Sequence, residues 1–142
     1  MFTSDDDLAR IARGISDASL PRAEWTHAAH FAVAVWILER RPDLDPFRDM
    51  SGFIRGYNAA TGGANTDTEG YHETITQASL RAARAFIDGL AAPTPLHAAV
   101  NALLASPLGH PDWLLDYWSK DVLLSVAARR GWVEPDLNPL PF

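Results

Sequence analysis

Residues 25–42 read WTHAAHFAVAVWILERRP, and this stretch decides the fold of the chain. From residue 28 to residue 38 the side chains are apolar on nearly every side of a helix, a pattern typical of a helix buried at the centre of a domain. The helix is expected to run from about residue 22 to residue 40, because Pro42 disfavours helical backbone at the residue before it.

Helix signals recur on both sides of this stretch. Ser4, followed three residues later by Asp7, predicts an N-terminus, and positions 8, 11 and 15 then place apolar side chains on one helical face. Asp45-Pro46 predicts the start of a further helix, which Gly62-Gly63 ends. Additional helices are expected over residues 71–90, residues 96–105 after the cap Thr94-Pro95, residues 113–117, and residues 119–131 after the cap Ser119.

Strand patterns are missing from the sequence, because apolar and polar residues never alternate for long. The sequence therefore predicts an all-α fold, a compact single-domain bundle of about five or six helices. Three prolines follow Trp132, so the Pro-rich C-terminal tail is expected to be extended and to lie across the bundle.

The length and composition restrict the function. A chain of 142 residues fits one domain, residues 1–142, and its 47% hydrophobic residues can form a core without a disulfide or metal. The net charge of -6 argues against nucleic acid as a partner. The absence of cysteine excludes thiol chemistry.

The longest apolar stretch, residues 31–38, is far shorter than the roughly 20 residues that span a membrane. With no membrane partner and no visible signal peptide, a cytoplasmic location is expected.

Three of the five histidines form the main candidate site. His27 and His30 are three residues apart and share a helix face, and His72 stands at the head of another predicted helix. Three neutral imidazoles with an open position would suit zinc or a similar divalent metal ion, whose bound water becomes a nucleophile. Glu73 or Asp67 would then serve as acid/base catalyst. In the other interpretation the histidines are half-buried, and backbone carbonyls or threonine hydroxyls satisfy them.

The segment NTDTEG at residues 65–70 is a second candidate feature, because its composition is typical of turns. Amides at the start of the following helix would point into the same region and hold an anion or a carboxylate. Alternatively, the segment is an ordinary connection in which Asp67 or Thr68 caps that helix. The residues expected to contact a small-molecule ligand are Asn65, Tyr71, Thr74, Tyr117 and Arg129.

Four sequence clusters together carry a resemblance. WTHAAH, the YN at residues 57–58, NTDTEGYHETIT and the ending YWS…LLSVAARRGWVEPDLNPLP resemble a family of small uncharacterised bacterial helical proteins. The match covers most of the chain from about Trp25 to Pro141, although Trp118 stands where that pattern has a second tyrosine. The resemblance implies that the histidines and NTDTEGYHET act as one unit between the second and fourth helices.

Two functions follow from these observations. In the first, the chain is a small-molecule-binding or metal-dependent enzyme with a histidine-centred polar site. In the second, it is a non-catalytic binding or interaction module in which the same polar cluster fixes helix packing. A bound divalent ion, or a histidine with a shifted pKa in a cleft, would favour the enzyme. A large apolar surface without a pocket would favour the module.

Overall fold

The computed structural model describes residues 1–91 and 93–142, and within these residues it contains helices and no strand. The all-α fold class is therefore confirmed. The α-helices are α1 (Asp5–Ser16), α2 (His27–Arg40), α3 (Pro46–Ala60), α4 (Glu73–Asp88), α5 (Leu96–Ala105), α6 (Lys120–Leu123) and α7 (Val126–Arg130). Three short 3-10 helices accompany them: η1 (Arg22–Glu24), η2 (Pro107–Gly109) and η3 (Trp113–Asp116).

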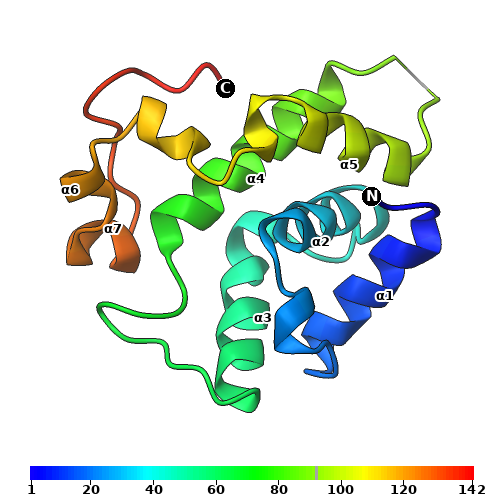
Figure 1. Ribbon diagram of the computed structural model, residues 1–142, viewed down its shortest axis with the longest axis horizontal. Coiled ribbons are helices and arrows are strands. Elements are labelled where there is room, and N and C mark those ends of the chain that lie inside the picture. Colours follow the sequence, from blue (N-terminus) through cyan, green and yellow to red (C-terminus); the bar gives the residue numbers. More distant parts are fainter. Residues whose placement is uncertain (92) are drawn as a thin grey trace.

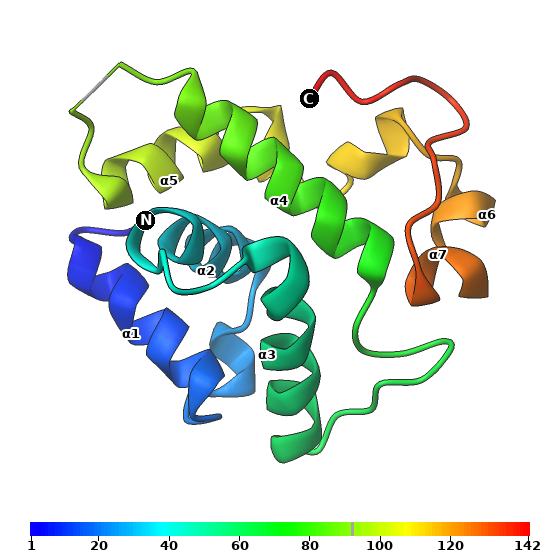
Figure 2. The same cartoon turned by 180° about the vertical axis from the view of Figure 1, so that it is seen from behind.

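Helix α2 lies at the centre of the molecule, as its sequence predicts. It packs against α1, α3, α4 and α5 (Figures 1 and 2), and its residues 31–35 are all buried. The predicted start near residue 22 is wrong. Thr26 has extended backbone, and its hydroxyl accepts a hydrogen bond from the Ala29 amide, so α2 begins at His27.

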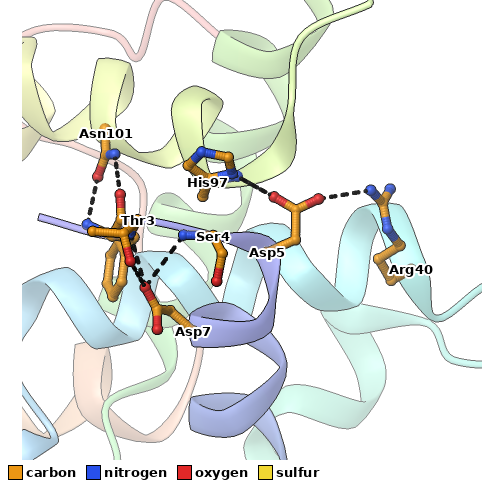
Figure 3. A network of polar contacts seen from close by, with 8 residues as sticks. Thr3, Ser4, Asp5, Asp7, Arg40, His97 and Asn101 are labelled. Carbon is orange, nitrogen blue, oxygen red and sulfur yellow. Dashed lines mark hydrogen bonds and ion pairs between the residues drawn. The ribbon is translucent and has the colours of Figure 1, made fainter.

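The N-terminal helix is joined to the bundle by the carboxylate of Asp5. This group accepts hydrogen bonds from the backbone N–H of His97 (2.8 Å) and from its Nδ1 (2.7 Å), and it contacts Arg40 at 3.3 Å (Figure 3). The hydrogen bond from the His97 backbone is the main cause that lowers the pKa of Asp5. The predicted cap is confirmed, because the Ser4 amide donates to the Asp7 carboxylate at the start of α1.

The C-terminal third differs from the single helix expected over residues 119–131. Ser119 caps α6 through the Val122 amide (3.3 Å), but Ser125 then caps a separate helix, α7, through the Ala128 amide (3.1 Å). A serine that offers its hydroxyl to a following amide competes with a continuous helix, which is why the segment breaks there. The N-cap residue of α5 is Pro95, and no side-chain hydrogen bond from a cap residue starts this helix. The predicted cap by Thr94 is therefore wrong.

Residues after α7 fold back onto the bundle. The Nε1–H of Trp118 donates to the Val133 carbonyl (2.9 Å), and the amide of Ser119 donates to Asp136 (2.7 Å). The Leu137 amide donates to the Tyr117 carbonyl (2.9 Å). Within residues 1–91 and 93–142, no helix is long and apolar enough to cross a membrane.

Candidate functional site

A pocket of about 320 Å³ opens where α2, α3, α4 and η3 meet. We call it the histidine pocket. Its side chains are mostly apolar, and the polar ones come from α2 and α4. The lining residues are His27, His30, Phe31, Ala34, Met50, Ile54, Ile75, Thr76, Ser79, Leu80, Pro111, Trp113 and Leu114. The sequence-predicted pair His27 and His30 therefore does lie in a cavity between the second and fourth α-helices.

Backbone carbonyls hold both imidazole rings of the pocket. Nε2 of His27 lies 2.9 Å from the carbonyl oxygen of Leu108, and Nδ1 of His30 lies 2.7 Å from that of Thr26. A carbonyl oxygen can only accept, so each of these nitrogens carries the hydrogen. Trp25 stacks on the His30 ring with centroids 3.7 Å apart and fixes its orientation.

The opposite ring nitrogens are consequently acceptors. In a neutral imidazole whose one nitrogen donates, the other carries a lone pair. These are Nδ1 of His27 and Nε2 of His30, and neither has a hydrogen-bond partner in the part of the chain that the structure describes. Burial is the main cause that lowers the pKa of His30, whereas the hydrogen bond to the Thr26 carbonyl acts in the opposite direction. His30 is thus held in its neutral form.

Helix α4 supplies polar residues that the sequence reasoning missed. Thr76 and Ser79 line the pocket one turn apart, beside the apolar Ile75 and Leu80. Helical spacing could have placed these four residues on one face, because positions i, i+1, i+4 and i+5 lie together on a helix. Nothing in the sequence, however, indicates that this face would meet the histidines of α2.

His72 does not join the other two histidines. It is the N-cap of α4 and only 7% exposed: its Nδ1 accepts from the Ile75 amide (3.2 Å), and its Nε2 donates to the Leu123 carbonyl (2.7 Å). Both ring nitrogens are therefore engaged. Among the described residues, no group of three or more His, Cys, Asp or Glu side chains could hold a metal ion. The expected cluster of three histidines is thus corrected to the pair His27 and His30.

Local geometry explains why the His72 side chain does not join His27 and His30. Its backbone is extended (φ -133°, ψ 110°), which suits the residue before a helix, and its imidazole takes the place that Asp67 or Thr68 was expected to fill. The helix begins at Glu73 rather than residue 71. His72 binds the Ile75 amide, so one of the first-turn amides expected to face an anion is already engaged.

The two predicted acid/base residues lie outside the histidine pocket. Glu73 accepts hydrogen bonds from the Tyr71 hydroxyl (2.9 Å) and from Gln77 Nε2 (2.7 Å). Burial, followed by this hydrogen bond to Glu73, raises the pKa of Tyr71. Asp67 forms a two-bond ion pair with Arg130, at 2.7 and 2.8 Å. Both carboxylates thus have partners within the protein.

The predicted ligand-contact residues also make internal contacts. The Asn65 side chain accepts from Asn58 Nδ2 (3.0 Å) and from the Tyr71 amide (3.2 Å), which holds the loop 61–72 together. The hydroxyl of Thr74, fully buried, donates to a carbonyl and accepts from an amide of the segment after α7. Arg129 donates to the carbonyl of Gly70 (2.9 Å).

Tyr117 is the last predicted contact residue. Its ring packs edge-on against Trp113 with centroids 6.0 Å apart, and the ring of Trp113 borders the histidine pocket. Tyr117 itself is not among the lining residues.

No family model, curated protein or solved structure matches the chain. The family resemblance drawn from the sequence clusters therefore stays a prediction, and the site has to be interpreted from its own geometry.

Proposed function

We propose that this chain binds a small, largely apolar molecule in the histidine pocket and accepts a hydrogen bond from its hydroxyl or amine group. The observation that carries the proposal is the pair of carbonyl-anchored imidazoles, which line an apolar cavity and each keep one nitrogen without a partner among the described residues. His27 and His30 supply the hydrogen-bond acceptors in this proposal.

The size and lining of the pocket set the class of ligand. A volume of about 320 Å³ is at the lower end of the range for small-molecule sites, and an apolar lining with a few polar groups is typical of them. The ligand's polar group must donate, because both free nitrogens accept. A carboxylate has no hydrogen to donate, and its negative charge would lie against apolar walls. Neutral alcohols, phenols and amines fit best.

A divalent metal ion, as the sequence expects, is the second candidate occupant. The free lone pairs of His27 Nδ1 and His30 Nε2 are the kind of ligand that zinc prefers, with a substrate or water completing the set. Metal content measured by mass spectrometry on untagged protein tests this version. Zinc, iron, manganese or nickel bound in near-stoichiometric amount in the wild type and lost in His30→Gln would support it, and metal-free protein after supplementation would contradict it.

Phenol and anisole are the matched probes for the binding proposal. They have nearly the same shape, but anisole carries a methyl group where phenol carries its hydroxyl hydrogen. Titrations followed by NMR should give phenol about three- to tenfold tighter binding, the value of one hydrogen bond between neutral groups.

Leucine variants test the role of each ring. In His27→Leu and His30→Leu the side chain carries no hydrogen-bond acceptor, so the free ring nitrogen is lost without a substitute. The preference for phenol should then fall in each variant and disappear when both are combined. The exposed His110 lies outside the pocket, and His110→Leu should keep the preference. Equal affinity for both probes in the wild type, or loss of the preference in His110→Leu as well, would contradict the proposal.

A further inference from the structure

A second hollow, of about 140 Å³, lies between α3, the loop 61–72 and α7. It shares no lining residue with the histidine pocket. We call it the arginine hollow, because one arginine from α3 and two from α7 meet there. Its lining residues are Arg55, Asn65, Thr66, Asp67, Tyr71, Arg129 and Arg130.

The charges around the hollow do not balance. Asp67 pairs with Arg130, but among the described residues no carboxylate lies within ion-pair distance of Arg55 or Arg129. Three cations therefore share one anion, in a chain whose net charge is -6. Like charges gathered at close range repel one another, so the bare hollow attracts an anion.

Arg129 is also short of hydrogen-bond acceptors. Its Nη1 donates to the carbonyls of Gly70 (2.9 Å) and Tyr71 (3.4 Å), both neutral groups. Its Nε is buried and has no partner in the part of the chain that the structure describes. A buried donor without an acceptor costs free energy, so a guanidinium held in this way gains from a charged acceptor beside it.

Arg55 lines the arginine hollow from the α3 side. Its guanidinium lies over the ring of Tyr71, 4.8 Å from the centroid, and makes no hydrogen bond to any described residue. Stacking on the ring orients the guanidinium and leaves its N–H groups free to donate.

We propose that the arginine hollow binds a phosphate-sized oxyanion, either free phosphate or the terminal phosphate of a small metabolite. The volume is too small for a whole drug-sized ligand but suits one anionic group. Arginine N–H groups match the oxygen geometry of phosphate. The Asp67 carboxylate competes with the oxyanion for Arg130, because it forms two hydrogen bonds with this guanidinium when no anion is bound.

An NMR titration with inorganic phosphate on the full chain tests the proposal. Sodium chloride keeps the ionic strength constant, so that general screening is the same at every point. Amide signals of residues 65–71 and the arginine Nε–H signals should shift and saturate. Arg55→Gln should weaken binding about five- to tenfold, as expected for a lost hydrogen bond to a charged group.

Two further variants distinguish binding from a change of local structure. Arg84 lies over the Phe47 ring at 4.6 Å, a matched stacked arginine outside the hollow, so Arg84→Gln should leave phosphate affinity unchanged. Asp67→Asn frees Arg130 and should tighten phosphate binding. A loss of affinity in Arg84→Gln equal to that in Arg55→Gln, or weaker binding in Asp67→Asn, would overturn the proposal.

A parallel titration with glycerol 3-phosphate identifies the source of the anion. Tighter binding than that of inorganic phosphate supports the terminal phosphate of a metabolite, and weaker or equal binding supports free phosphate. Shifts that fail to saturate with both compounds, or that sodium chloride alone reproduces, would overturn the proposal.

Discussion

Replacing His72 with alanine removes two interactions at once, and the loss can be estimated for each. The N-cap contact from Nδ1 to the Ile75 amide contributes about 1 kcal/mol. The Leu123 carbonyl, bonded at 2.7 Å by Nε2, would lose its partner in a site where His72 is 7% exposed, at a cost of about 1–3 kcal/mol. The free energy of unfolding should therefore fall by about 2–4 kcal/mol, which lowers Tm by about 6–12 °C for a chain of this size.

Urea unfolding followed by circular dichroism measures this loss, and His72→Asn separates its two parts. Asparagine can still cap α4 but is too short to reach the Leu123 carbonyl. The free energy of unfolding of His72→Asn should therefore lie between those of the wild type and His72→Ala. Any metal bound by His27 and His30 should remain in both variants. The reasoning is refuted if His72→Ala is as stable as the wild type, if His72→Asn is no more stable than His72→Ala, or if metal bound by the wild type is lost with His72.

The remaining predictions concern pH, a loop and a buried hydroxyl. Burial lowers the pKa of His30 and His72 below 6.5, so at lower pH the unfolded chain takes up protons that the folded chain does not. The free energy of unfolding, measured by urea at each pH, should therefore fall from about pH 7 to pH 5, and a flat profile would contradict this. Gly70 has φ +83°, and a Cβ there would collide with a loop carbonyl, so Gly70→Ala should lower Tm, whereas Gly56→Ala, with nothing near its Cβ, should not. Thr74→Val should cost about 1–3 kcal/mol in urea unfolding, because two backbone groups lose their hydroxyl partner; Thr74→Ser keeps the hydroxyl, and an equal loss there would argue against this cause.

Local patterns in the sequence predict most of the helices. The apolar run at residues 31–38 marks the central helix, and Asp45-Pro46 marks the start of α3, because capping and burial act on residues that are close in the sequence. The same local rules fail at residues 119–131, where Ser125 can either continue a helix or cap a new one. In the structure the Ser125 hydroxyl accepts from the Ala128 amide and starts a new helix.

In the candidate site, too, the sequence determines some features and only the tertiary structure decides the others. The HxxH spacing in WTHAAH determines by itself that His27 and His30 share a face of one helix, because helical geometry fixes the positions of residues three apart. Only the tertiary structure decides which nitrogen of His27 is free, since the Leu108 carbonyl that holds this ring is 81 residues away in the chain. The Thr26 carbonyl that holds His30 is, by contrast, a local partner at the start of the same helix. The tertiary structure also decides that His72 turns toward the Leu123 carbonyl and that Arg55 and Arg129 share a hollow. Contacts between distant segments depend on how helices pack, and no local pattern in the sequence encodes them.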